Sequence, residues 1–151
     1  MIYHLERDTF IPGAQQEVFS FFSDARNLER LTPGFLGFEI MTPMPMEMKA
    51  GALIDYRLKL FGVPLRWRTR IDEFEPISHF VDVQLSGPYR LWRHRHEFRT
   101  VPGGTQMRDQ VDYELPFGPI GTVARTLFVR STLDRIFDYR SSVIQDLFRR
   151  R

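Results

Sequence analysis

The chain has 151 residues, a net charge of +2 at pH 7 and 42% apolar residues, which fits one folded domain over residues 1–151 and excludes a disordered chain. It has no cysteine, so disulfides, thiolate metal sites and a cysteine nucleophile are all excluded. The charge is too nearly balanced to indicate nucleic acid as a partner by itself.

The N-terminal part predicts one strand followed by two short helices. The strand covers residues 2–11 and ends at the turn signal Pro12-Gly13. The helices fall within residues 14–31, where apolar residues recur at helical spacing and Asp24 can cap the second helix.

Six further strands are predicted between the short helices and the last fifth of the chain. They cover residues 35–42, 52–61, 64–74, 79–86, 90–100 and 105–115. Every break between them contains proline or glycine, which favour turns. Because a parallel return needs a crossover of about a dozen residues, these short links predict antiparallel pairing.

The C-terminal part is helical in pattern, beginning after Pro116-Phe117-Gly118-Pro119. A break near Ser131-Thr132 leaves open whether it forms one helix or two. Its apolar face comprises Leu133, Ile136, Phe137, Val143, Ile144, Leu147 and Phe148. The whole order predicts an α+β fold in which a seven-stranded curved antiparallel sheet wraps around the long C-terminal helix.

Alternation along the strands assigns one face of the sheet to the interior. The clearest case is residues 64–74, where Trp67 and Thr69 oppose the arginines at 66, 68 and 70. An aromatic wall with a few polar groups is typical of a small-molecule pocket. The predicted ligand-binding residues are Tyr56, Trp67, Thr69, Trp92, His94, His96, Asp109 and Tyr113.

For the strand predicted over residues 79–86, the alternation does not show which face points to the interior. Either the set Phe80, Asp82 and Gln84 or the set Val81, Val83 and Leu85 faces inward, and the period alone does not decide.

Three polar residues stand out on the inner face: His94, His96 and Asp109. A His-x-His pair points both rings to one side of a strand, as in some metal sites. A buried carboxylate that satisfies the imidazoles explains the same residues without an ion, so we expect no metal and no other cofactor. The three are also the candidate catalytic residues, because Asp109 beside His94 or His96 would give a general acid–base pair. Without a nucleophile motif, phosphate loop or cofactor fingerprint, the sequence favours binding over catalysis.

Two other groups of residues have structural explanations. The outward arginines 66, 68, 70, 93 and 95 form a basic stripe, but Asp55, Asp72, Glu97 and Asp112 can pair with them across strands, so nucleic-acid binding is not expected. The methionines at 41, 44, 46 and 48 suit either a flexible gate at the pocket mouth or plain loop packing, and we favour packing.

The order of elements resembles the helix-grip, or SRPBCC and START-like, superfamily, which includes START lipid-transfer domains, the birch-pollen-allergen family and aromatic polyketide cyclases. The run from Gly87 to Phe98, the motif Asp109-x-x-x-Tyr113-x-Leu115-Pro116-Phe117-Gly118 and the corner Leu31-Thr32-Pro33 resemble its bacterial ligand-binding subfamily. The resemblance implies binding or transport of a small hydrophobic ligand, lipid-like or aromatic, between the sheet and the C-terminal helix. Its alternative implication is a cofactor-free polyketide cyclase or dehydratase that uses the His/Asp pair.

The expected location follows from features that the sequence lacks. No stretch approaches about 18 apolar residues, so stable membrane insertion is not expected. The first six residues show no charged start before an apolar run, so a signal peptide is not expected. Absence of cysteine suits a reducing compartment, and we expect a cytoplasmic protein. The oligomeric state has no signature in the sequence.

Overall fold

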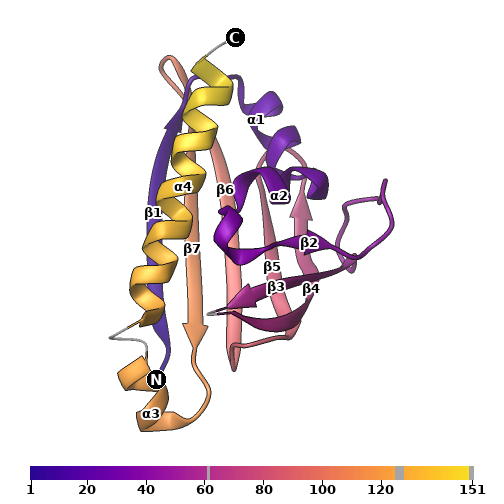
Figure 1. Cartoon of the computed structure of the whole chain (residues 1–151). Coiled ribbons are helices and arrows are strands. Elements are labelled where there is room, and N and C mark those ends of the chain that lie inside the picture. Colours follow the sequence, from indigo (N-terminus) through magenta and orange to yellow (C-terminus); the bar gives the residue numbers. More distant parts are fainter. Residues whose placement is uncertain (61, 125–127, 150–151) are drawn as a thin grey trace.

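The computed structural model describes residues 1–60, 62–124 and 128–149, and its centre is one seven-stranded sheet (Figure 1). The strand order is β1-β7-β6-β5-β4-β3-β2, and every neighbouring pair is antiparallel. The strands are β1 (Tyr3–Ile11), β2 (Glu39–Ile40), β3 (Leu53–Leu60), β4 (Val63–Glu75), β5 (His79–Ser86), β6 (Leu91–Val101) and β7 (Gly104–Glu114). The α+β helix-grip architecture predicted from the sequence is confirmed.

Helices α1, α2 and α4 lie on the concave side of the sheet, with the longest, α4, running along β1 and β7, whereas α3 lies at one end of the molecule (Figure 1). They are α1 (Gln15–Phe22), α2 (Leu28–Leu31), α3 (Gly118–Ala124) and α4 (Arg130–Arg149), with short 3-10 turns η1 (Ala25–Asn27) and η2 (Gly34–Leu36). Ser131-Thr132 lies in the first turn of α4, and the two residues before Arg130 are also helical, so the break considered at this position is not found there.

The strand predicted over 35–42 is much shorter than expected. Only Glu39 and Ile40 pair with β3, while residues 34–36 form η2. Gly37 follows η2 with a left-handed backbone, φ 54°, which turns the chain before a strand can begin. The turn places Leu36 in the interior, so the apolar character of this segment reflects burial without strand pairing.

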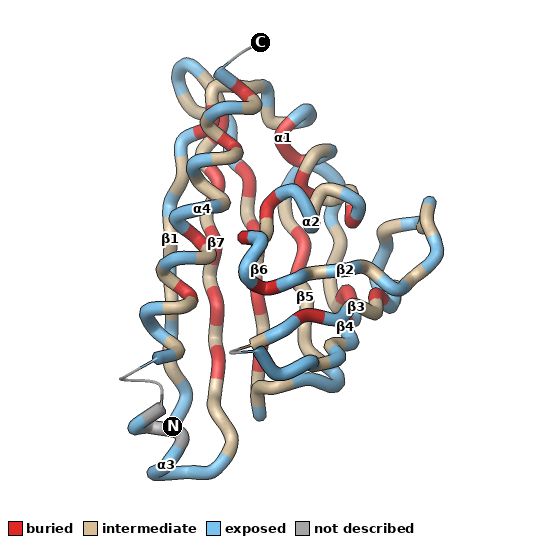
Figure 2. Tube along the Cα trace, in the orientation of Figure 1, coloured by how far each residue is buried: buried red, intermediate tan, exposed pale blue. Residues whose placement is uncertain are grey.

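The inner face of the sheet follows the predicted alternation most clearly in β6 and β7, where buried and less buried residues alternate (Figure 2). Trp92, His94 and His96 are all buried, and across the ladder His96 pairs with Asp109. Pairing of these two long strands thus brings the three polar residues of the sequence analysis to one place.

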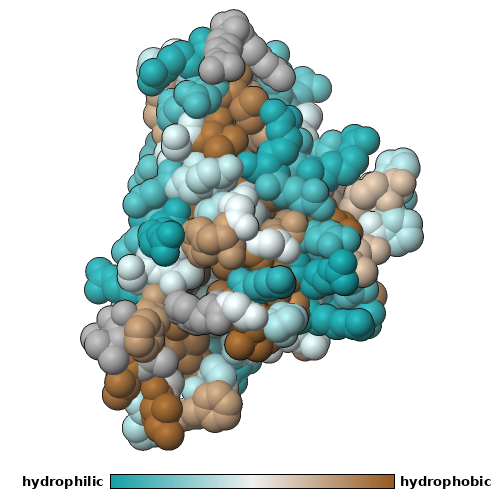
Figure 3. Space-filling view, viewed as in Figure 1, coloured by the Kyte–Doolittle hydropathy of each residue, from teal (hydrophilic) through white to brown (hydrophobic). Residues whose placement is uncertain are grey.

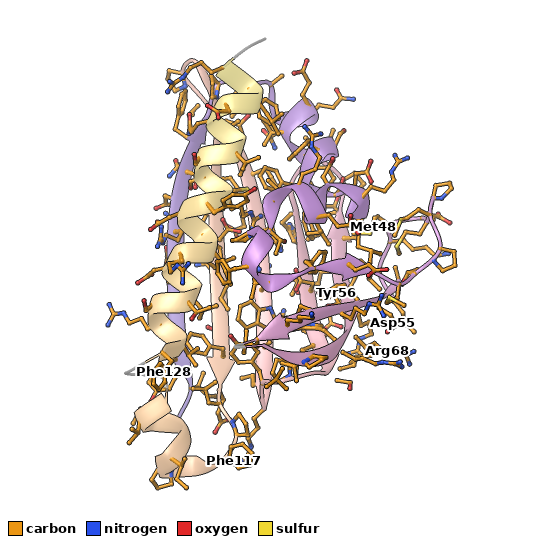
Figure 4. The ribbon with its side chains drawn as sticks, viewed as in Figure 1. Met48, Asp55, Tyr56, Arg68, Phe117 and Phe128 are labelled. Carbon is orange, nitrogen blue, oxygen red and sulfur yellow. The ribbon has the colours of Figure 1, made fainter. Side chains whose placement is uncertain are left out.

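The outer face carries ion pairs between arginines and carboxylates. Arg68 donates to Asp55 at 2.8 Å, and Figure 4 shows the two side chains pointing toward each other. Arg70 lies 2.7 Å from Asp72 and Arg95 donates to Glu97, but each of these pairs lies within one strand. Asp72 also accepts from Arg93 of β6. Pairing between strands is therefore found for Asp55 and Asp72, whereas Glu97 pairs within β6 and Asp112 contacts His4.

The methionine-rich loop packs against the sheet for most of its length. Met44, Met46 and Met48 are half-buried against the cluster formed by Ala25, Ile54 and Ile71, whereas Met41 is exposed. Packing therefore accounts for three of the four methionines.

Candidate ligand-binding cavity

A cavity of about 210 Å³ lies between the concave face of the sheet, the turns that follow α1, and α4. Its wall is mostly apolar and aromatic, and it lies where the three apolar clusters of the core meet. Met48, in the loop before β3, and Tyr56, on β3, belong to one side of it (Figure 4). The residues that α4 contributes are Thr132, Leu133, Ile136, Phe137 and Arg140.

Six of the eight predicted ligand-binding residues line this cavity. They are Tyr56, Trp67, Thr69, Trp92, His94 and His96. The other two lie behind the wall: Asp109 is buried beneath His94, and the ring of Tyr113 packs 6.3 Å from that of Trp92. These two positions can orient the wall, and they do not themselves face the cavity.

The polar side of the cavity consists of two hydrogen-bonded imidazole–carboxylate pairs. His94 Nε2 lies 2.8 Å from Asp109 Oδ1, and His96 Nε2 lies 2.7 Å from Asp82 Oδ2. The two imidazoles stack with their centroids 3.7 Å apart. Phe80 stacks on the other side of His96 at 4.1 Å, so three flat rings form one continuous stack.

The same contacts settle which face of β5 points inward. Phe80 and Asp82 both contact His96, and the side chain of Gln84 bonds the backbone of Tyr89. Val81 is nevertheless fully buried on the opposite face, where its strand partners are Glu73 and Arg95. Burial on both faces explains why the period of this strand was uninformative.

Hydrogen bonding fixes the proton positions on both imidazoles. An ionised carboxylate only accepts hydrogen bonds, so each Nε2 must carry the proton and donate it. In a neutral imidazole the other nitrogen, Nδ1, then has a free lone pair. In each pair Nδ1 is therefore the nitrogen that can accept a hydrogen bond.

Arg140, on α4, is a charged side chain of the cavity wall that the sequence analysis missed. It lines the cavity with only 12% of its side chain exposed, and its Nη1 lies 3.6 Å from Asp109 Oδ1. The sequence analysis did not distinguish it from the other arginines of this helix. Its spacing was the available signal, since it falls three residues after Phe137 and four before Ile144 on the apolar stripe.

Burial and charge set the protonation of this cluster. Burial lowers the pKa of His96 to about 4, and the neighbouring His94 acts in the same direction. Burial raises the pKa of Asp109, but Arg140 and the bond from His94 outweigh it and hold the pKa below its ordinary value. Burial likewise raises the pKa of Asp82, and the bond from His96 with the nearby positive charges outweighs it, so this pKa is also lowered. Near neutral pH the cluster thus contains two carboxylates, one guanidinium and a neutral His96.

A metal ion fits this arrangement poorly. Ligand atoms of Asp82, His94 and His96 do lie within 4.8 Å of one another. The imidazole planes, however, are only 20° from parallel, so their in-plane lone pairs run side by side and do not converge on one point. Both Nε2 atoms also donate to carboxylates. The geometry favours paired hydrogen bonds over a metal centre.

The far wall is an aromatic cluster with its own polar contact. The Trp67 ring packs edge-on against Trp92 at 5.5 Å and lies 6.0 Å from Tyr56. Tyr56 Oη lies 2.6 Å from the hydroxyl of Thr69, and burial raises the pKa of this phenol, so it stays protonated. The indole Nε1 of Trp67 is buried and has no hydrogen-bond partner among the described residues.

The fold, with its cavity between sheet and C-terminal helix, defines a helix-grip domain. The chain belongs to the family of polyketide cyclases/dehydrases and lipid-transport proteins, whose sequence profile matches residues 11–138. Ligand binding and cyclase chemistry are the activities associated with this family. No curated protein matches the chain by sequence.

Solved structures share the fold. The Zhui aromatase/cyclase from Streptomyces sp. R1128 is 15% identical with a TM-score of 0.78, over 100% of this chain and 96% of that one. The protein TTHA0849 from Thermus thermophilus is 16% identical, with a TM-score of 0.70 over 94% and 97% of the two chains. A nucleoside-diphosphate sugar epimerase from Corynebacterium glutamicum is 28% identical, with a TM-score of 0.68, and the match covers 94% of this chain but 28% of that protein. Among the described residues, no helix is long and apolar enough to cross a membrane.

Proposed function

We propose that the protein binds or transports a small hydrophobic molecule, lipid-like or aromatic, in the cavity between the sheet and α4. The observation that carries this is the cavity itself, whose wall is mostly apolar and aromatic and has one polar side around His94. A cavity of about 150 Å³ holds one benzene molecule. At about 210 Å³, this cavity suits a compact ligand of one or two rings. Apolar walls supply affinity, and the few polar groups orient the ligand.

The polar stack supports a ligand with a hydroxyl group. His94 lines the cavity and uses Nε2 for Asp109, and its Nδ1 makes no hydrogen bond with any described residue. A phenol or enol can donate to this nitrogen, whereas an ether or a hydrocarbon cannot. We propose that Tyr56, Trp67, Thr69 and Trp92 contact the ligand's apolar part, and that His96, Asp109 and Tyr113 hold the wall in place.

The first prediction concerns this preference. We expect calorimetric titration to show 2-naphthol binding about tenfold more tightly than 2-methoxynaphthalene, because only the former donates a hydrogen bond. His94→Phe is expected to remove the preference while keeping a flat ring in the stack. Equal affinities of the original protein for the two compounds would refute the role of His94.

A cavity-filling variant tests the location independently of polarity. Ala25 is buried in the cavity wall, so Ala25→Leu places extra carbon atoms in the space and is expected to weaken binding at least tenfold. Ala14→Leu, at an exposed site outside this cavity, is the matched control. Native mass spectrometry of the protein purified from its own host then identifies what it carries. If both leucine variants bind like the original protein, the ligand lies elsewhere.

A second candidate function is cyclase or dehydratase chemistry in the same cavity. Its support is the Asp109–His94 pair, because a carboxylate that fixes the imidazole tautomer leaves Nδ1 as a general base. The distinguishing measurement is the mass of the compound released after incubation. A binding protein returns the compound unchanged, whereas a dehydratase returns it lighter by one water.

A further inference from the structure

The end of the molecule that carries α3 exposes an apolar stripe that the proposed function does not use. Ile120 and Val123 are three residues apart and therefore lie on one side of this short helix, and Phe117 directly precedes its first residue. Phe117 is 78% exposed and Ile120 is 73% exposed. Hydrophobic atoms gather at this end in Figure 3, and Phe117 lies at the tip of the molecule in Figure 4. We call these three residues the α3 stripe.

The backbone at Phe117 adds a second observation. Its φ of 73° is in the left-handed region, where a residue with a side chain is held at a cost of about 1 kcal/mol or more. Its ring gains little from packing, because most of it is exposed. The conformation aims a large apolar ring outward, which disfavours the isolated chain in water unless something else covers the ring.

The size and charge of the stripe indicate what covers it. A stable protein–protein interface uses about 20–30 residues on each side, far more than the stripe offers. A lipid surface, in contrast, accepts a few apolar side chains at the boundary of its headgroups. Residues 115–124 contain no charged side chain at all. Two exposed arginines flank them: Arg90, whose backbone bonds Glu114, and Arg130 at the start of α4.

We propose that the α3 stripe docks the protein on the surface of a bilayer that contains anionic lipid. The apolar side chains enter the headgroup boundary, and Arg90 and Arg130 attract the negative headgroups. Docking here also brings the first turn of α4, where Thr132 and Leu133 line the cavity, close to the lipid. The proposal stands whether or not the cavity binds the ligand class named above.

Vesicle sedimentation tests the proposal with a matched pair of variants. The full chain is expected to sediment with vesicles of phosphatidylglycerol and phosphatidylcholine, less with phosphatidylcholine alone, and less in high salt. Phe117→Gly is expected to reduce partitioning about tenfold or more, because it removes the most exposed apolar ring. Its unfolding temperature should stay the same or rise, since glycine accepts the left-handed backbone. Ile77 also has a positive φ, of 71°, on an exposed turn, so Ile77→Gly is the control expected to retain binding.

Three outcomes overturn the proposal. The first is that the original protein fails to sediment with the anionic vesicles, and the second is that the Phe117→Gly and Ile77→Gly variants lose binding equally. The third is a dimer in sedimentation velocity that grows with protein concentration and disappears in the Phe117→Gly variant. That result assigns the stripe to a second copy of the chain instead of to lipid.

Discussion

Replacing Asp109 with leucine is expected to lower the free energy of unfolding by about 3–5 kcal/mol, as for other buried pairs that lose one partner. The carboxylate is 2% exposed, accepts a hydrogen bond from His94 and lies 3.6 Å from the guanidinium of Arg140. Without it, a buried guanidinium and a buried imidazole N–H both lose their counterpart. Urea denaturation followed by circular dichroism measures the change.

A double variant separates this explanation from simple loss of packing. Adding Arg140→Met to Asp109→Leu removes the uncompensated charge and replaces it with an apolar side chain of similar length. We expect the double variant to be more stable than Asp109→Leu alone, because a buried ion pair exchanged for apolar groups is often neutral. If the second change destabilises the protein further, the charge of Arg140 is not what Asp109 compensates.

The second large effect is a loss of stability in mild acid. Burial lowers the pKa of His96 to about 4, whereas the unfolded chain titrates this group at about 6.5. Between these two values the unfolded state binds the proton and the folded state does not, so acid favours unfolding. Above pH 6.5 titration of His96 has no effect on the free energy of unfolding. As the pH falls from 6.5 to 4, it lowers this free energy by about 3 kcal/mol. Denaturation midpoints measured at several pH values across this range test it.

The variant His96→Gln is the control for this window. Its amide still donates to Asp82 but does not titrate, so the stability curve is expected to be flatter between pH 6.5 and 4. Asp82 and Asp109 act in a different range. Their lowered pKa values stabilise the fold above the ordinary carboxylate pKa, and that contribution is lost only as the pH falls below about 4. A curve as steep for His96→Gln as for the original protein would contradict the assignment.

Most of the fold was predictable because the long strands have one clear inner face. In β6 and β7 the alternation is nearly complete, and pairing them fixes the positions of Trp92, His94 and Asp109 together. The conformation of residues 34–40, where the sequence predicted a strand, was not predictable. There the apolar residues are buried by a 3-10 turn and a left-handed glycine, and neither leaves a periodic pattern.

Most residues of the cavity wall that lie on strands were predicted, whereas the two charged residues Asp82 and Arg140 were not singled out. Asp82 was one of two alternatives, because ion pairs on the outer face allow Val81 to be buried as well. Arg140 was not among the predicted residues, although its helical position is on the apolar stripe. A charged residue can occupy such a position only when a buried counter-charge exists, and that counter-charge, Asp109, lies 31 positions earlier in the sequence.

Trp67 and Trp92 are the only two tryptophans in the chain, and both are part of the cavity wall. Excitation at the red edge of the protein's absorption selects tryptophan, so the fluorescence comes from the cavity wall alone. A guest molecule that absorbs at longer wavelength should dim both emitters at once by energy transfer, without any dye attached. The wavelength of maximum emission also reports how much water surrounds the two indoles. Fluorescence can therefore follow ligand binding and release in real time.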